Sequence, residues 1–197
     1  MAGPDGLRLF SPDPRGIIPI GGFHVPHGTR RAWKEMDWEL RVDSCFPEVM
    51  LACAEREETW IDETIFRSYV ALHEAGSAHS VEIWCGGRLA GGLYGVRIGA
   101  AFFGESMFHR VTNASKIALC CLVALLRKGG FQLLDTQWVT PHLAGFGAVE
   151  IPRPDYMRML AGAVACQTDF KDATLPRPLL DSLLKSGSHA LDQSSPP

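Results

Sequence analysis

The spacing of apolar and polar residues predicts helices around one strand in the first part of the chain. Residues 1–23 are dense in proline and glycine, which is typical of loops with short extended pieces. The periodicity that follows predicts three elements: a helix at 29–36, a strand at 38–43 and a helix at 46–57. A further helix is expected at 62–76, because apolar residues at helical spacing lie between a capping Asp62 and a terminal Gly76.

The middle of the chain changes to a strand pattern. Three strands joined by glycine-containing turns, as in a meander, are predicted at 78–85, 88–96 and 100–108. A helix at 113–128, with Asn113 or Ser115 as its cap, is closed by two glycines and leads to a strand at 131–139. This order of elements predicts a mixed α/β fold.

Composition narrows the class of protein. The chain has 197 residues, of which 46% are hydrophobic and 21% charged, as expected for one main globular domain. The net charge of −3 provides no overall basic field, so any contact with nucleic acid must use a local patch. The longest apolar stretch, 117–126, is too short to cross a bilayer. Six cysteines without a CxxC pair or metal-ligand spacing indicate a reducing cytoplasm, and no metal site is expected.

Polar residues inside apolar strands are the first candidates for chemistry. Alternate residues of a strand share a face, so Asp135 and Gln137 are expected to lie side by side at the end of an otherwise apolar row. A strand emerging into solvent would produce the same pattern. Glu105 lies between apolar residues, where it is either a site carboxylate or a loop or cap acid.

A second candidate is a small basic cluster. Arg30, Arg31 and Lys34 fall on one predicted helix, which is either a solvated face or a surface that contacts phosphates. The histidines lack metal-ligand spacing and are interpreted as structural, in particular His79, His109 and His142.

Eight segments together resemble one known family. In order, these are GTRRAWK, TWIDETI, AHSVEIW, GGLYGV, FFGESMF, NASKIAL, LLDTQWVTPHL and FGAVEIPRPDY, with SPDPRG at 11–16 belonging to the same pattern. Over about residues 9–165 they resemble the bacterial leucyl/phenylalanyl-tRNA–protein transferases.

The resemblance implies both an activity and a fold. Such an enzyme moves Leu or Phe from an aminoacyl-tRNA to the amino terminus of a protein that begins with Arg or Lys, which marks the product for degradation by the N-end rule. The implied fold is similar to the acyl-CoA N-acyltransferase (GNAT) fold, a mixed sheet flanked by helices. No cofactor is expected, and no coenzyme A, since the glycines of RKGGFQ at 127–132 precede a strand and do not open a helix.

The same resemblance assigns roles to particular residues. Asp135 would accept a hydrogen bond from the side-chain amide of Gln137, so that the Gln137 oxygen becomes a better acceptor for the proton of the incoming amine. Glu105 would bind the cationic acceptor. The remaining assignments are Trp60, Phe102 and Leu134 as walls of the apolar slot, and Arg30, Arg31 and Lys34 as contacts to the phosphates of the tRNA.

The beginning of the chain differs from the family pattern. Only ten residues precede Ser11, where members carry several dozen, and Leu9 and Phe10 replace an aromatic pair. The expected organisation is therefore the remnant of an amino-terminal annex with the basic helix at 1–45, a GNAT-like catalytic domain at 46–166 and a loosely held tail at 167–197. A cytoplasmic monomer is expected. Two alternatives stay open: a CoA-dependent N-acyltransferase of related fold, and a non-catalytic module that binds the tRNA end or protein amino termini.

Overall fold

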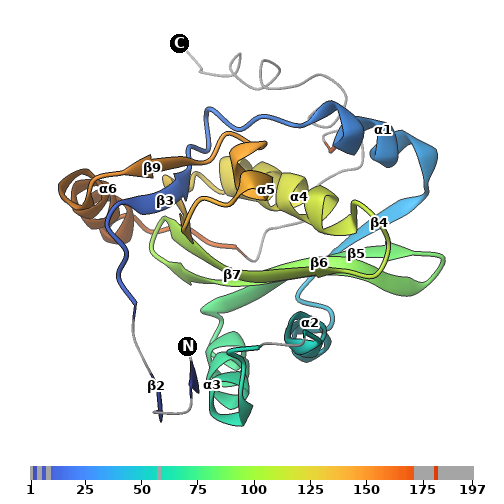
Figure 1. Cartoon of the computed structure of the whole chain (residues 1–197), viewed down its shortest axis with the longest axis horizontal. Coiled ribbons are helices and arrows are strands. Elements are labelled where there is room, and N and C mark those ends of the chain that lie inside the picture. Colours follow the sequence, from blue (N-terminus) through green and yellow to red (C-terminus); the bar gives the residue numbers. More distant parts are fainter. Residues whose placement is uncertain (1, 4–5, 8–9, 57–58, 171–179, 182–197) are drawn as a thin grey trace.

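One mixed β-sheet forms the centre of the protein. The structure is a computed structural model that describes residues 2–3, 6–7, 10–56, 59–170 and 180–181. Seven strands follow the order β4-β5-β6-β7-β8-β3-β9, and all neighbours are antiparallel except β7 and β8 (Figure 1). Their bounds are β3 (Arg15–Ile18), β4 (Trp38–Val42), β5 (Ala78–Cys85), β6 (Arg88–Ile98), β7 (Ala101–His109), β8 (Leu133–Gln137) and β9 (Val149–Ile151). Two short strands, β1 (Ala2–Gly3) and β2 (Gly6–Leu7), pair separately.

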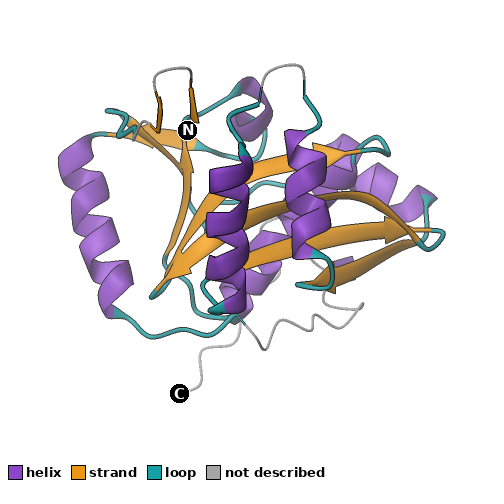
Figure 2. Ribbon diagram, turned by 90° about the horizontal axis from the view of Figure 1, so that it is seen from below, coloured by secondary structure: helices purple, strands orange, loops and turns teal. Residues whose placement is uncertain are grey.

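Helices cover both faces of this sheet, as Figures 1 and 2 show. On one face lie α1 (His27–Glu35) and α4 (Ala114–Lys128), and on the other α2 (Phe46–Ala54) and α3 (Glu63–Glu74). The one-turn α5 (Pro141–Ala144) follows β8, and α6 (Arg153–Ala165) lies at one end of the sheet. The coarse prediction of a mixed α/β fold is therefore confirmed.

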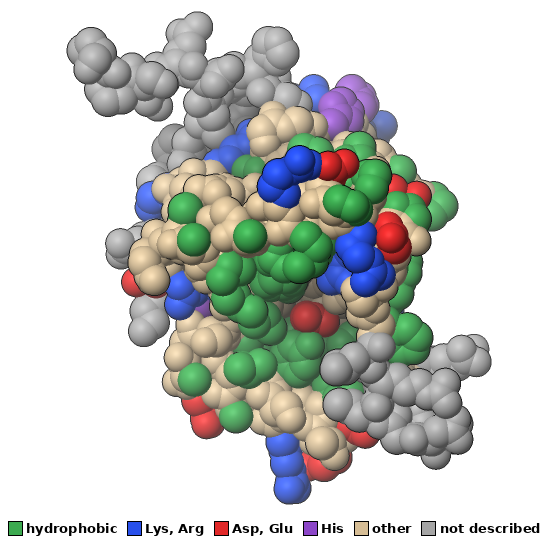
Figure 3. Space-filling view, turned by 90° about the vertical axis from the view of Figure 1, so that its left-hand side faces the viewer, with side chains coloured by type: hydrophobic (Ala, Val, Ile, Leu, Met, Phe, Trp, Pro, Cys, Tyr) green, Lys and Arg blue, Asp and Glu red, His purple; other side chains and the backbone are tan. Residues whose placement is uncertain are grey.

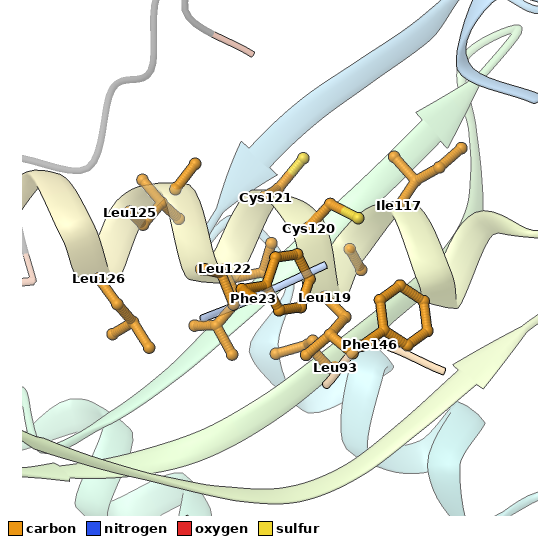
Figure 4. Close-up of a cluster of buried hydrophobic side chains, with 14 of the residues drawn as sticks. Phe23, Leu93, Ile117, Leu119, Cys120, Cys121, Leu122, Leu125, Leu126 and Phe146 are labelled. Carbon is orange, nitrogen blue, oxygen red and sulfur yellow. The ribbon is translucent and has the colours of Figure 1, made fainter. Parts of the chain in front are cut away.

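The helix α4 contributes more residues than any other element to the larger of the hydrophobic cores. Twelve of its fifteen residues are buried. They include Cys120 and Cys121, whose side chains pack among leucines and phenylalanines (Figure 4). A helix that is apolar around most of its circumference must be covered on several sides, here by the sheet, α1 and the segment around Phe146. None of the six cysteines forms a disulfide bond, and each lies in the described part of the chain.

Local signals set the element boundaries much as the sequence predicts. The carboxylate of Asp62 accepts a hydrogen bond from the backbone N–H of Ile65 at 2.8 Å, and Gly76 takes a left-handed φ of +73° just after α3. Asn113 occupies the N-cap position of α4, but its side chain makes no capping bond. Of the two expected cap residues, Asn113 and Ser115, the N-cap is therefore Asn113, and Ser115 lies inside the helix.

The two ends of the chain are integrated more closely than expected. Strands β3 and β4 come from residues 1–45, so the sheet itself crosses the boundary that we place at residue 45. Phe170 and Leu180 are each 2% exposed, and the indole of Trp33 donates to Asp181 at 2.7 Å. These residues of the predicted loose tail are packed against the core, whereas 171–179 and 182–197 lie outside the described residues. None of the described helices has the length and apolar character required to cross a membrane.

Candidate active site

The candidate site lies where the two parallel strands separate. Strands β7 and β8 pair only from Ala101–Phe103 to Leu133–Asp135, although β7 continues to His109. Beyond the last pair, the structure contains a pocket of about 700 Å³. Figure 3 shows one face of the molecule on which hydrophobic side chains gather around a hollow that holds acidic atoms.

The pocket has an apolar end between α4 and the sheet. Its walls there are aliphatic side chains that also belong to the larger core: Leu93, Met107, Leu119, Leu122 and Leu134. Figure 4 shows Leu119 and Leu122 on the same side of α4 as Leu93 of β6. A slot built in this way takes a flexible or planar apolar group without polar partners.

The other end of the pocket is aromatic and polar. Trp60, Tyr69 and Tyr94 pack with the smaller core beneath the sheet, and Glu105 lies among them at the pocket wall. In the pairing of β6 with β7, Tyr94 faces Ser106 and Gly95 faces Gly104, so Glu105 is an extra residue on its strand. Such a bulge re-aims the side chain of a strand residue.

The carboxylate of Glu105 is partly buried and has no hydrogen bond from a cationic side chain among the described residues. Burial raises its pKa, and hydrogen bonds from Tyr69 and Gln137 partly offset this rise. The side-chain Nε2 of Gln137 donates to Oε2 of Glu105 over a long 3.4 Å. A desolvated carboxylate of this kind is suited to binding a cation that reaches the pocket.

Asp135 occupies a different position from Gln137. It is fully buried, and its Oδ1 accepts from the backbone N–H of Gln137 at 2.7 Å. The guanidinium of Arg15 donates to the same carboxylate, from Nε at 3.1 Å and from Nη2 at 2.9 Å, and the hydroxyl of Tyr156 donates to Oδ2. Asp135 is not among the residues that line the pocket.

This geometry corrects two expectations. Gln137 has a φ of +65°, so the regular alternation of strand faces ends there and its side chain lines the pocket with Leu134 and Thr136. Asp135 and Gln137 therefore do not share one face of the strand. The expected bond from the side-chain amide of Gln137 to Asp135 is also wrong, because Asp135 receives the backbone N–H and the amide points to Glu105.

The other predicted site residues divide between the pocket and other places. Trp60 and Leu134 line the pocket, at its aromatic and apolar ends. Phe102 does not line it, because its ring is fully buried and stacks on Phe170 with centroids 5.4 Å apart.

The three cations do lie together on α1, and none of them lines the pocket. The Nε of Arg30 donates to the carbonyl of Val25 at 3.0 Å. Arg31 pairs with Glu35 at 2.6 Å on an exposed surface, and Lys34 is exposed.

Several residues of the site have no clear signal in the sequence. Arg15 and Tyr156 lie within SPDPRG and FGAVEIPRPDY, which carry the family resemblance, but neither residue is assigned a role from the sequence. Leu119 and Leu122 are three residues apart in a helix that looks entirely like core. Only the separation of β7 from β8 turns these leucines into walls of a pocket.

No feature of the described residues provides a metal site, since no three His, Cys, Asp or Glu side chains are placed to share an ion. Gly129 and Gly130 end α4, so their backbone amides lie at a helix carboxyl terminus. Phosphates are normally bound at the opposite end of a helix.

The pocket lies at the separation of two parallel strands in a mixed α/β fold, and it is apolar at one end and polar at the other. These features indicate an enzyme that acts on an apolar group carried by a polar substrate. The chain belongs to the leucyl/phenylalanyl-tRNA protein transferase family, whose model matches residues 17–161. The resemblance identified in the sequence is thus confirmed.

Individual relatives agree with this assignment. A leucyl/phenylalanyl-tRNA–protein transferase of Cereibacter sphaeroides is 54% identical over 164 residues, which cover 83% of this chain and 77% of the relative. The corresponding protein of Akkermansia muciniphila is 53% identical over 170 residues, 83% of this chain and 88% of the relative. That of Phenylobacterium zucineum is 49% identical over 191 residues, 95% of this chain and 86% of the relative.

Proposed function

We propose that this protein transfers Leu or Phe from an aminoacyl-tRNA to the amino-terminal Arg or Lys of an acceptor protein, which is thereby marked for degradation. The observation that carries this proposal is a pocket whose apolar end adjoins Glu105 and Gln137, in a chain of the transferase family. One end suits the Leu or Phe side chain and the other suits a cationic amine.

The apolar end supports the choice of amino acid. The space lined by Leu93, Leu122 and Leu134 suits the flat ring of Phe or the flexible chain of Leu. Burying such a side chain contributes about 1.5–3 kcal/mol. The apolar end of the pocket gives no such gain to a polar amino acid, whose side chain would lose its hydrogen bonds to water.

The polar end supports the transfer step. The neutral α-amino group of the acceptor attacks the ester carbonyl, an N–C bond forms, the C–O bond to the ribose breaks, and the amine proton leaves with the ribose oxygen. With its Nε2 directed to Glu105, the Oε1 of Gln137 is available to accept an N–H of the attacking amine and align it. An α-amino group with a pKa near 8 is already about one-tenth neutral at pH 7, so alignment rather than strong base catalysis is required.

Glu105 supports the preference for a cationic acceptor. Its partly buried carboxylate gains a charge-assisted hydrogen bond when the Arg or Lys side chain, or the ammonium form of the amino terminus, enters the pocket. The bond also returns to the carboxylate part of the solvation lost on burial.

The wider setting completes the proposal. The separation of the parallel strands β7 and β8 supports a GNAT-like catalytic fold, and the exposed Arg31 and Lys34 support phosphate contacts from α1. Cysteines without disulfide bonds support a cytoplasmic location.

The test is a transfer assay with radiolabelled Phe-tRNA. Two acceptors that differ only in an amino-terminal Arg or Asp are compared, and label is expected in the Arg acceptor alone. Gln137→Ala should lower the rate without abolishing transfer, since it removes alignment but leaves a reactive ester. Label in neither acceptor, or acylation of the Arg acceptor from acetyl-CoA, would refute the proposal.

A further inference from the structure

We infer that Arg15 and Tyr156 are positioning residues of the transfer reaction, acting through Asp135 on the backbone of Gln137. This inference rests on the proposed function for its kinetic consequence, but its structural basis is independent of that function. Neither residue was a candidate from the sequence, and together they join β3, β8 and α6 at one carboxylate.

Asp135 is fully committed to groups of its own chain. Both of its oxygens accept from Arg15, Oδ2 also accepts from Tyr156, and Oδ1 also accepts from the Gln137 N–H. A carboxylate with no exposed surface and five such hydrogen bonds has no position left for a substrate. Its influence on transfer must therefore pass through the residues that it holds.

Gln137 is the residue that Asp135 holds in an unfavourable conformation. A left-handed φ of +65° is uncommon for a residue with a side chain, and it persists only where the surroundings enforce it. The 2.7 Å bond from its N–H to Asp135 is such a restraint. The left-handed turn also directs the side chain toward Glu105, on the pocket side of the strand.

Arg15 and Tyr156 in turn fix the orientation of Asp135. The guanidinium of Arg15 makes a two-pronged contact with the carboxylate and lies 5.1 Å from the centre of the Tyr156 ring. Burial, and then the bond to Asp135, raise the pKa of Tyr156 above its usual range, so its hydroxyl stays protonated and donates.

The test uses Tyr156→Phe, since Tyr156 is not among the pocket residues and the ring is retained. We expect kcat to fall about ten-fold with KM unchanged for both Phe-tRNA and the Arg acceptor, because a misaligned Gln137 affects the reacting atoms and not substrate binding. Leu160→Ala in the same helix is the control for general loosening of α6 and should leave kcat unchanged. If kcat fell as much in Leu160→Ala as in Tyr156→Phe, the inference would be overturned.

A double-mutant cycle tests the route through Gln137. Adding Tyr156→Phe to Gln137→Ala should cause no further loss of kcat, whereas additive losses would overturn the inference. If Tyr156→Phe fails to fold, Arg15→Lys takes its place in the cycle, because lysine keeps the charge but loses the two-pronged contact. Arg15 also lines the pocket, so its variant supports the inference only if kcat falls with KM unchanged, and a change in KM alone would overturn it.

A second readout needs no catalysis. In the 15N–1H spectrum, the amide proton of Gln137 should shift in Tyr156→Phe and stay in place in Leu160→Ala. An unchanged Gln137 resonance in Tyr156→Phe would overturn the inference, whether or not the wild-type protein shows transfer activity. If the wild-type protein shows no transfer, the proposed function is refuted, and this resonance still decides whether Tyr156 positions Gln137.

Discussion

Replacing Gly16 with alanine is expected to disturb the site through the backbone of Gln137 and Trp138, against which Gly16 packs. Gly16 follows Arg15 on β3 and faces Gln137 across the pairing with β8. A Cβ at this position would lie 2.5 Å from the carbonyl carbon of Trp138 and 2.9 Å from both its Cα and its oxygen. All three atoms are backbone, so no side chain can rotate away to make room.

The size of the effect follows from these distances. A contact of 2.5 Å is roughly 0.9 Å short of the 3.4 Å at which ordinary van der Waals contact begins, so β3 or the 137–138 turn must move by that amount. Overpacking of this kind typically lowers the free energy of unfolding by about 1–3 kcal/mol. A displacement near 1 Å at a group that aligns reacting atoms lowers kcat by up to about 100-fold.

The assay measures both quantities on the same samples. Urea unfolding gives the change in stability, and single-turnover transfer from labelled Phe-tRNA gives the rate at a temperature where the variant is folded. Gly21→Ala is the matched control, because its Cβ would meet no atom within 4 Å. It should keep its rate and gain at most about 1 kcal/mol from the reduced entropy of the unfolded chain. A Gly16→Ala protein with normal stability and a normal rate would refute the idea that this close approach holds the turn.

Four further predictions address other parts of the molecule. Leu122→Phe should fill part of the apolar slot and lower kcat/KM for Phe-tRNA about ten-fold more than for Leu-tRNA. An Arg-initiated peptide should bind less tightly as pH falls, and it should lose affinity at a higher pH than an exposed glutamate would impose, because burial raises the pKa of Glu105. Arg31→Ala should reduce the slope of log tRNA affinity against log salt by about 0.7–0.9. Phe170→Ala should lower unfolding free energy by about 3–5 kcal/mol, since its buried ring stacks on Phe102.

Each of these predictions has a specific contradicting outcome. Equal losses with the two tRNAs would show that Leu122→Phe merely distorts the core. If the affinity of the Glu105→Gln protein for the peptide still falls at acidic pH, another group is responsible for the pH dependence. Arg67→Ala is the control for α1, because Arg67 forms a similar exposed i,i+4 pair with Glu63 on α3, and an equal change of slope in both variants would exclude a site on α1. Unchanged stability of the Phe170→Ala protein would show that packing of Phe170 does not stabilise the fold.

The elements predicted from the sequence are those with strong local signals. The strand at 78–85 is found with the same bounds, and α3 lies between the predicted Asp62 cap and Gly76. Both depend on neighbours within a few residues, through periodicity, caps and left-handed glycines. Pattern alone therefore predicts the strand and helix order that places the site on β7 and β8.

The details of the site depend on contacts that local patterns do not contain. The left-handed Gln137 is held by a carboxylate that is itself fixed by residues 120 positions earlier and 21 positions later. The position of Glu105 depends on a bulge in the pairing of β7 with β6. Phe170 looked like part of a polar tail because nothing near it in the sequence is apolar at regular spacing, and its partners Phe102 and His79 are distant.

The two carboxylates of the site differ in what they can do for a substrate. Asp135 is fully buried, paired with Arg15 and surrounded by donors of its own chain, so binding a ligand there would break bonds that already exist. Glu105 is partly buried and receives hydrogen bonds from neutral donors, and burial raises its pKa because it disfavours the ionised form. A cation entering the pocket therefore gains more from Glu105 than from Asp135. The burial that makes Glu105 unfavourable in the free protein thus favours a cationic acceptor when the pocket is filled.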